Sequence, residues 1–586
     1  MSAPRRKRTR AQKRPGLSRR GFLRGFGLVG ATLVGSATLQ GCGSDGSSPS
    51  GSGSGSGTPT TPAGDGAPAQ SVSFVHSVAS GDPLFDRVIL WTRITPTQAA
   101  QAVAGRVEVF EDEALTKPVK SINFTTDSSR DFTVKIDCTG LQADKFYFYR
   151  FTSNGSNSPV GRTRTMPATG TDRALNLGLV SCSSIAHGFF NAYNFLAKRN
   201  DLDAIVHLGD YIYEYGNGEY GSLREYQPPG EIKTLSDYRT RHSQYKQEED
   251  LRALHLRYPF ITIWDDHESA DNSYTDGANN HNEGEGEWPV RKAAAQKAYD
   301  EWMPIRLPEP GNANKIFRKI QLGDMAELIL LDTRLFDRDQ DLGIPINPVT
   351  GNASDPNRTM IGQEQMDFLI GGLRNSKARW KLIGNQVVFH QWIIKPGVNN
   401  PAPAPAPVQD VLAPSGLNGD SWDAYSAERQ KIIHALRGSD GGEAVNDVVI
   451  LTGDVHSAWV ADITDNPNLP ISQVGGYNPL TGDGSVATEF VVSSITSPGL
   501  PIPDEVVQAI RVSSPHIKHV KMSERGYSIL RLSKEKAVCE YWAVSTILQK
   551  GGTEAMSARF EVLQGTNRIN AGLLGGLPLP IALPTP

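Results

Sequence analysis

The stretch Ala204-Ile-Val-His-Leu-Gly-Asp-Tyr-Ile-Tyr-Glu214 decides the fold class of this 586-residue chain. Its first five residues are an apolar run typical of a buried strand, and Gly209 and Asp210 follow where that strand would end. Asp210 and Tyr213 lie three residues apart on the expected turn. A carboxylate that can bridge two cations and a phenol that suits a ferric ion are therefore predicted beside one strand end.

The same pattern, an apolar run followed by a polar residue, occurs five more times along the chain. The runs are residues 177–180, 260–263, 328–331, 381–383 and 448–451, followed by Cys182, Asp265-Asp266-His267, Asp332, Asn385 and Asp454. Helical spacing between runs, for example at 189–198, indicates an α/β domain with buried strands. In open α/β sheets functional sites lie outside the carboxyl ends of the strands, so these polar residues are the candidate site.

Between Ser71 and about Pro167 the sequence predicts short strands instead of α/β layering. Leu141 and Tyr147 resemble the tyrosine-corner region of immunoglobulin-like sandwiches. The expected strands lie at 73–79, 88–93, 106–110, 132–136 and 147–150. We predict a small all-β, immunoglobulin- or fibronectin-like domain over 71–168, which packs against the larger domain at 172–564 or shapes its entrance.

The amino terminus has the pattern of an export signal. Residues 1–41 contain ten Lys and Arg and no acidic residue, and the stretch Ser18-Arg-Arg-Gly-Phe-Leu23 precedes an apolar run from about Gly25 to Thr38. That run is shorter than the ~20 residues a membrane span needs, and the pattern resembles a twin-arginine signal. Leu39-Gln-Gly-Cys42 resembles a lipobox, which predicts a lipid anchor at Cys42 in the periplasm or at the cell surface; cleavage and release is the alternative.

Composition excludes several classes of protein. Residues 42–70 are mostly Gly, Ser, Pro and Ala, which predicts a flexible tether, and 565–586 has no pattern and is expected to be a disordered tail. Without residues 1–41 the formal net charge falls from −4 to −14, which argues against nucleic-acid binding. The four cysteines form no CxxC pair, so neither a disulfide scaffold nor a structural zinc site is expected. Cys138 and Cys539 are expected to be free thiols, although pairing in an oxidising compartment stays open.

The candidate ligands differ in chemical type. Asp454 and His456 are two residues apart, and in an extended segment such residues point the same way. The Cys182 thiolate would be a soft ligand for a transition metal, whereas carboxylate and amide oxygens favour Ca²⁺, Mg²⁺ or Mn²⁺. The mixture predicts a centre that holds more than one kind of metal.

The oxygen donors expected to complete it are Asp210, Asp266 and Asn385. An Asp that follows a strand is often only a helix N-cap, which is the competing interpretation for each carboxylate taken alone. The choice between Asp265 and Asp266 as the ligand stays open.

An ordered set of motifs gives the chain a family resemblance. The motifs are Val78-Ala-Ser-Gly-Asp-Pro83, Leu90-Trp-Thr-Arg93, Val180-Ser-Cys182, His207–Glu214, Trp264-Asp-Asp-His-Glu268, Leu331-Asp-Thr-Arg334, Gly384-Asn-Gln386 and Gly453-Asp-Val-His-Ser-Ala-Trp459. With these motifs in this order, the chain resembles the PhoD-like alkaline phosphatases. That family is related in fold to purple acid phosphatases and other calcineurin-type metallophosphoesterases. The resemblance spans roughly residues 73–562.

The resemblance implies a layered metallophosphoesterase β-sandwich flanked by helices. It also implies a ligand set: Fe³⁺ held by Cys182, Asp210, Tyr213 and His456, and one or two Ca²⁺ ions held by Asp210, Asp454, Asn385 and Asp266. In this scheme clustered cations neutralise the phosphate oxygens and generate a hydroxide that attacks phosphorus. His267 or Arg334 would protonate the leaving group or hold a phosphate oxygen.

We therefore expect an exported alkaline phosphatase that hydrolyses phosphate monoesters, and diesters as a further class, for phosphate scavenging. One alternative is a phosphodiesterase or phospholipase D of the same family. Another is a surface-anchored binding protein with a decayed site, although a complete ligand set argues against decay. The expected partners are small phosphate esters, the twin-arginine machinery and the membrane, with no nucleic acid, and the chain is expected to be a monomer.

Overall fold

The computed structural model of the chain describes residues 71–97, 102–343, 351–394, 415–416, 418–499 and 514–570, together with residues 507 and 511. The predicted export signal, the tether with Cys42 and most of the predicted tail lie outside these residues. Within the described ranges no helix combines the length and apolar character needed to cross a bilayer.

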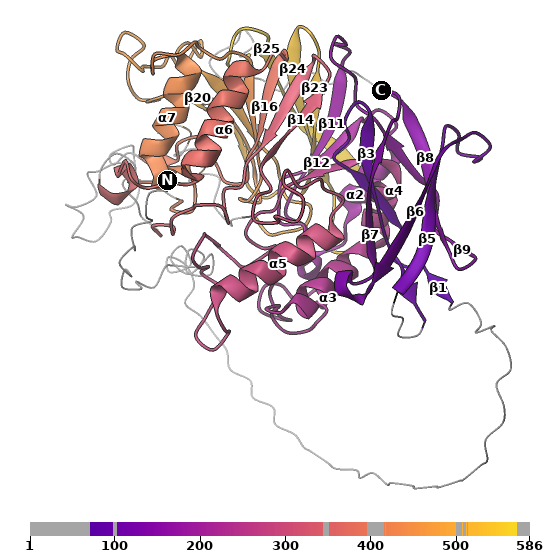
Figure 1. The fold of residues 1–586 in the computed structure, drawn as a ribbon. Coiled ribbons are helices and arrows are strands. Elements are labelled where there is room, and N and C mark those ends of the chain that lie inside the picture. The colour runs from indigo at the N-terminus through magenta and orange to yellow at the C-terminus, as the bar shows by residue number, and fades with distance from the viewer. Residues whose placement is uncertain are drawn as a thin grey trace, which may run out of the picture.

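Two large sheets pack face to face at the centre of the molecule (Figure 1). The first has nine strands in the order β25 (Glu554–Leu563), β24 (Lys536–Val544), β23 (Gly526–Leu532), β11 (Leu175–Val180), β12 (Ala204–His207), β13 (Phe260–Thr262), β2 (Val78–Gly81), β3 (Arg87–Arg93) and β7 (Thr133–Thr139). The second has seven, in the order β14 (Arg318–Leu322), β15 (Ala326–Leu330), β16 (Trp380–Gly384), β19 (Val448–Thr452), β21 (Ala487–Val491), β20 (Ala458–Ile463) and β22 (Ile517–Lys521). All six strands predicted between residues 177 and 451 are present.

The predicted site edge follows from strand direction. β11, β12 and β13 run parallel, as do β15, β16, β19 and β21, so within each group the carboxyl ends lie together. Two short ribbons, β1 (Val72–Ser73) with β4 (Thr95–Pro96) and β17 (Ile393–Ile394) with β18 (Ser415–Gly416), lie outside the large sheets.

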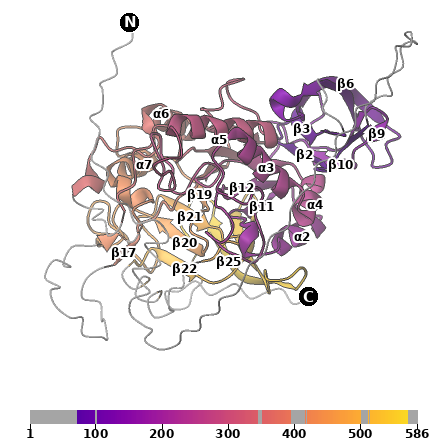
Figure 2. The same ribbon diagram turned by 90° about the horizontal axis from the view of Figure 1, so that it is seen from below.

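Helices cover the outer faces of both sheets, which explains the continuous apolar runs. In β15, Leu328 and Leu330 join the core between the sheets, whereas Ile329 packs toward the helices on the other face. Figure 2 shows α6 (Gly362–Asn375) and α7 (Ser426–Arg437) on one side, and α2 (Asn191–Lys198) and α4 (Glu249–Arg257) on the other. α3 (Leu235–Lys246) and α5 (Trp288–Trp302) pack against each other along one edge.

The N-terminal β unit is a sandwich, but its inner sheet is not independent. A third sheet has the order β10 (Gly161–Arg164), β8 (Phe146–Ser153), β5 (Ala102–Phe110) and β6 (Pro118–Asp127), with β9 (Ser156–Asn157) pairing β8. It packs on β2, β3 and β7 through an apolar core, and Gln142 N donates to the Tyr147 hydroxyl at 2.9 Å.

This inner sheet continues into the rest of the nine-stranded sheet, unlike the separate domain that the sequence predicts. β2 pairs parallel with β13 at Gly81 and Phe260. A Cβ at Gly81 would lie 2.2 Å from the Pro304 carbonyl oxygen, so only glycine permits this approach. Pairing between strands about 180 residues apart leaves no local sequence signal.

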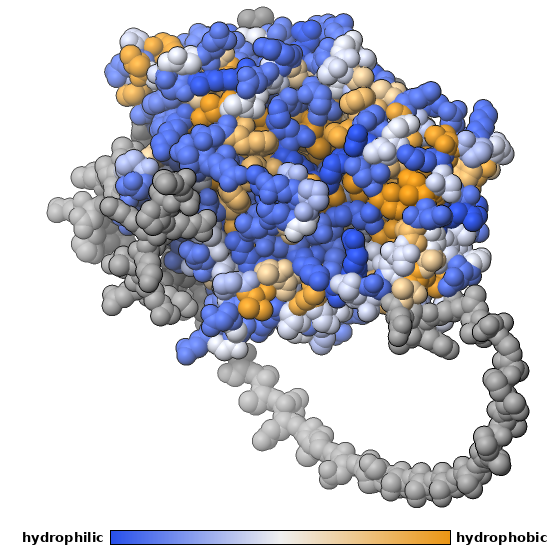
Figure 3. Space-filling model, viewed as in Figure 1, coloured by the Kyte–Doolittle hydropathy of each residue, from blue (hydrophilic) through white to orange (hydrophobic). Residues whose placement is uncertain are grey.

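Figure 3 shows apolar residues over the N-terminal β unit at the right of an otherwise mostly hydrophilic face.

Candidate metal centre

The loops that follow the strands hold several candidate ligands in strained backbone. Cys182, Asp210, Asp454 and His456 have φ angles of 61°, 55°, 65° and 55°, in the left-handed region that non-glycine residues seldom adopt. Such strain gathers at functional sites, where surrounding structure enforces it. Gly209 is required beside them, because its φ is 105° and a Cβ there would lie 2.4 Å from the Asp265 Cβ.

The four residues predicted to hold iron come together. Ligand atoms of Cys182, Asp210 and His456 lie within 4.8 Å of one another. The Tyr213 hydroxyl donates to Asp210 Oδ2 at 2.8 Å and lies 3.1 Å from His456 Nε2. All four are buried, with His456 the most exposed at 4%. Three segments distant in sequence thus present a thiol, a carboxylate, a phenol and an imidazole to one point.

Carboxylates extend this group into a second one. Ligand atoms of Asp210, Asp266 and His267 lie within 4.8 Å of one another, and so do those of Asp265, Asp266 and Asp454. Asp266 belongs to both sets and therefore connects Asp210 with Asp454. Asp265 has one carboxylate oxygen bonded to Arg334 Nε. The geometry favours Asp266 over Asp265 as the ligand nearer to Asp210.

Asn385 follows its strand as predicted, but its amide makes other contacts. Its Nδ2 donates to the Val387 carbonyl and to Thr452 Oγ1, and its Oδ1 accepts from Trp422 Nε1 at 3.1 Å. These bonds fix the amide between two loops. Of the predicted ligands, Asn385 has the least support from the geometry.

His267 is held by a second buried carboxylate. Its Nδ1 lies 2.7 Å from Glu214 Oε2, and both side chains are fully buried. Burial disfavours the charged imidazole, but Asp266 and Glu214 outweigh it and raise the pKa of His267 well above its usual range. Because Nδ1 contacts Glu214, Nε2 is the ring nitrogen that can exchange a proton with a molecule bound at the site. Glu214 lies within the first motif quoted, although its sequence position alone assigns it no role.

Arg334 carries the compensating positive charge. Its Nε bonds Asp265, its Nη1 donates to Asp420 at 2.8 Å, and its Nη2 donates to Asp454 at 3.1 Å. Burial opposes its charged form, but Asp265 and the other nearby carboxylates raise the pKa of this guanidinium well above its ordinary value. Arg334 therefore orients carboxylates, and the alternative of Arg334 as a proton donor does not fit this geometry.

The sequence model of PhoD-like phosphatases matches residues 177–541. The chain belongs to this family. The model of the PhoD-like phosphatase N-terminal domain matches residues 59–167. This PhoD-like phosphatase is 33% identical to alkaline phosphatase D of Bacillus subtilis (strain 168) over 504 residues, which is 84% of this chain and 81% of that protein. The chain is a phosphoric ester hydrolase.

Solved structures agree with the fold. The structure of PhoD superposes with a TM-score of 0.75 at 31% identity and covers 87% of this chain and 93% of its own. A purple acid phosphatase from yellow lupin (Lupinus luteus) has a TM-score of 0.51 at 13% identity, over 84% of this chain and 74% of its own, and shows a shared fold alone. The predicted relation to purple acid phosphatases is confirmed at the level of fold.

Two further residues of this PhoD-like phosphatase support the ligand loops. Glu268 accepts hydrogen bonds from the backbone N–H groups of Asp210, Asp265 and Tyr211, and so ties the loops after β12 and β13 together. Ser497 Oγ lies 2.6 Å from the Tyr213 hydroxyl oxygen. Glu268 could have been noticed inside the Trp264–Glu268 motif, whereas Ser497 lies in a segment without a pattern.

Arg525 is a cation on the other side of the ligand group. Its Nη1 donates to the Glu524 carbonyl at 2.9 Å, and it lies against Gly499, next to the Pro498 carbonyl that contacts His456 Nδ1 at 2.9 Å. Burial lowers the pKa of Arg525, and the nearby Tyr220, Cys182 and Tyr213 oppose that shift. No sequence motif points to Arg525.

The donor set fits cations on two grounds. First, four buried aspartates lie close together: ligand atoms of Asp210 and Asp266 are within 4.8 Å of each other, as are those of Asp265, Asp266 and Asp454, and Arg334 bonds Asp265 and Asp454. Buried charge of one sign is costly without compensation. Second, burial and then the Asp210 carboxylate raise the pKa of the Cys182 thiol well above its usual range. A thiolate there requires a metal ion beside it.

Proposed function

We propose that this phosphatase is a metal-dependent alkaline phosphatase that hydrolyses phosphate monoesters, with diesters as a further class. The observation that carries the proposal is the convergence of Cys182, Asp210, Tyr213 and His456 beside an all-oxygen group. Thiolate, phenolate and imidazole suit Fe³⁺, whereas the carboxylates suit Ca²⁺.

In this proposal Cys182, Asp210, Tyr213 and His456 hold iron, and Asp210, Asp266 and Asp454 hold calcium. Asn385 would contribute only if its amide oxygen binds a cation in addition to Trp422. Bound cations would supply neutralisation of the phosphate oxygens and a water of lowered pKa. Asp210 is the residue common to both sites, so it sets their spacing.

His267 is the proposed proton donor to the leaving alkoxide. Glu214 fixes its Nδ1 and favours its charged form, so a proton is available at Nε2. The ring also packs against Tyr213, with ring centres 4.2 Å apart, which sets its orientation. General acids of this kind contribute about 10²–10⁴ in rate.

Arg525 is the proposed holder of a non-bridging phosphate oxygen. Arg334 is committed to three carboxylates, whereas Arg525 has one backbone acceptor for Nη1 and presents further N–H donors beside the ligand group. A planar guanidinium binds phosphate oxygens in pairs.

The proposal is tested on protein exported through its native route. Elemental analysis should find about one iron and one or two calcium ions per chain, and hydrolysis of p-nitrophenyl phosphate should exceed that of bis-p-nitrophenyl phosphate. Preferred cleavage of the diester, or of phosphatidylcholine, would favour the phosphodiesterase alternative. Protein that holds neither metal and hydrolyses no ester would contradict the proposal.

We further propose export by the twin-arginine route and lipid anchoring at Cys42. The basic residues, the Arg19-Arg20 pair, the short apolar run and the lipobox support this address. The N-terminal unit begins at about residue 71, which leaves a tether of about 28 residues after Cys42. A flexible chain of that length has an average span of roughly 30 Å, enough to hold the enzyme clear of a membrane.

A further inference from the structure

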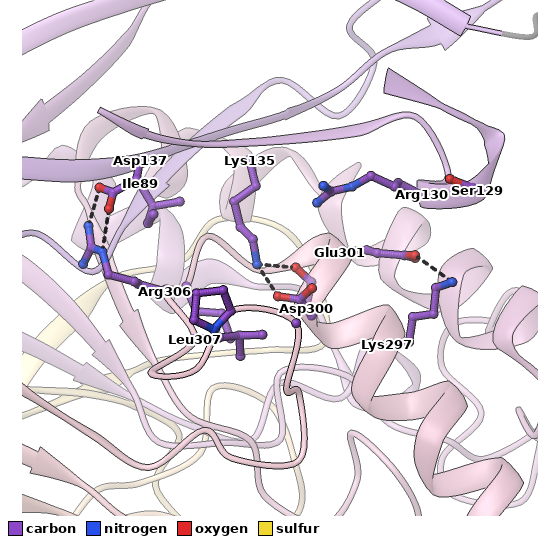
Figure 4. Close-up of a pocket in the computed structure, with 13 residues that line it drawn as sticks. Ile89, Ser129, Arg130, Lys135, Asp137, Lys297, Asp300, Glu301, Arg306 and Leu307 are labelled. Atoms are coloured by element: carbon purple, nitrogen blue, oxygen red, sulfur yellow. Dashed lines mark hydrogen bonds and ion pairs between the residues drawn. The ribbon is translucent and has the colours of Figure 1, made fainter. Parts of the chain in front are cut away.

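A cavity of about 540 Å³ lies at the junction between the N-terminal β unit and the catalytic body, away from the metal ligands. None of the predicted metal ligands lines it. One wall comes from β3, β7 and the turn after β6, and the other from the end of α5 and the segment after it (Figure 4). We call it the junction cavity; its lining residues include Ile89, Arg130, Lys135, Lys297, Leu307 and Pro310. Its volume is that of a small-molecule site.

Ion pairs on both sides hold the junction cavity open. Arg306 binds Asp137 through two N–H groups at 2.7 and 3.0 Å and so crosses from the catalytic body to β7. Arg239 binds the Glu301 carboxylate at 2.7 Å and the Ser129 carbonyl at 2.7 Å. The two walls are therefore fixed before any ligand enters, which lowers the entropic cost of binding.

The charges inside the cavity do not balance. Its three carboxylates already have close partners: Asp137 binds Arg306, Asp300 binds Lys135, and Glu301 binds Arg239. Two cations remain, one on each wall. The Lys297 side chain is 53% exposed and lies 3.9 Å from Glu301, which already pairs with Arg239. The Arg130 guanidinium makes no hydrogen bond or ion pair within the described residues.

Arg130 and Lys135 also act on each other. Burial lowers the pKa of Lys135, and Arg130 contributes to that shift, so the two cations are close enough to repel. Figure 4 shows the Arg130 side chain directed into the cavity toward Lys135. An anion bound at Arg130 would weaken this repulsion.

Apart from Ser129 and Gly311, the uncharged lining residues are aliphatic. Ile89, Ile305, Leu307 and Pro310 face the cavity, and the lining contains no aromatic side chain. A ligand with an alkyl part therefore suits it better than a ligand with a nucleobase, which would seek a stacking partner.

We propose that the junction cavity binds a small aliphatic organic anion, with its phosphonate, phosphate or carboxylate group between Arg130 and Lys297. The bound anion would connect the two units by an additional bridge. The site is independent of the metal centre and of the function proposed for it.

The test is calorimetric titration of the full-length, metal-loaded protein with hexylphosphonate and with hexanoate. Binding of hexylphosphonate alone indicates a phosphate-type ligand, and binding of both indicates any anion with an alkyl part. Arg130→Gln and Lys297→Gln should each weaken binding about tenfold, because each removes a charge-assisted hydrogen bond. Hydrolysis of p-nitrophenyl phosphate and the melting temperature should not change in either variant.

Arg106→Gln is the matched control, because the Arg106 side chain is 52% exposed on the same unit and lies outside the cavity. It should leave the affinity unchanged. Hexylphosphonate that binds both cavity variants as tightly as the native protein would place all binding at the metal centre and overturn the proposal. Absence of binding by either anion, or equal binding of uncharged hexanol, would also overturn it.

Discussion

Asp210→Asn removes one negative charge at the point where the two ligand groups meet, while keeping the size of the side chain. The backbone there should not move, because the Asp210 N–H remains bonded to Glu268 and an amide oxygen can still accept from Tyr213. Both proposed metal sites would lose a shared carboxylate. We expect iron and calcium content to fall together and hydrolysis to drop at least about a thousandfold, which corresponds to ~4 kcal/mol of lost transition-state stabilisation.

Although Asp210→Asn should lower metal content and activity, it should not lower the unfolding free energy of the metal-free protein. Asp265 and Asp454 lie in the same carboxylate cluster, and one guanidinium, Arg334, compensates both. Removing one of several like charges should leave the metal-free variant as stable as the metal-free native protein, or more stable by on the order of 1–2 kcal/mol. Loading with metal should stabilise the native protein and not the variant, because only binding to the folded state shifts unfolding.

The assays are elemental analysis, hydrolysis of p-nitrophenyl phosphate and urea unfolding with and without chelator. Asp203→Asn is the control, since Asp203 is also buried and binds Arg164 and Arg173 at 2.7 and 2.9 Å outside the metal centre. It should lower stability and keep the metals. An Asp210→Asn variant with native metal content and turnover within tenfold of native would refute the assignment of Asp210.

Three further outcomes are expected. His267→Gln should lower kcat about 10²–10⁴-fold while iron and calcium stay bound, as measured by steady-state kinetics with metal analysis, because Glu214 and not a metal fixes the ring. Cys42→Ser should move the protein from the membrane to the soluble exported fraction on cell fractionation, with activity retained; an unchanged distribution would exclude the anchor. Burial holds the pKa of Lys246 well below 10.5, so folding releases its proton and the unfolding free energy should rise as pH increases toward 10.5. Lys246→Met should make that rise smaller in urea unfolding across this range, because it removes the contribution of Lys246.

Local sequence patterns predicted the strands and most of the residues that converge at the candidate site, because each of these features is defined by a few neighbouring residues. An apolar run buried on both faces is visible in the sequence, and the residue after it is fixed at the sheet edge, as for Cys182 and Asp454. The features that escaped prediction depend on contacts between distant segments. The junction of β13 with β2, the pairing of Arg334 with Asp420, and the position of Arg525 beside the ligands are examples.

The permanent charge of Arg334 explains how a site rich in carboxylates can exist in the folded chain before metals bind. Its guanidinium neutralises Asp265, Asp420 and part of Asp454, at the outer side of the cluster. On the other side of the cluster Cys182 and Tyr213 lie near Arg525, and burial raises the pKa of the Cys182 thiol, so this thiol keeps its proton when no cation is present. A site divided in this way can fold without metal and gain charge compensation, with release of protons, when metal is bound. Because its ligands converge only in the folded chain, export of the folded protein would allow the metals to be acquired before the enzyme crosses the membrane.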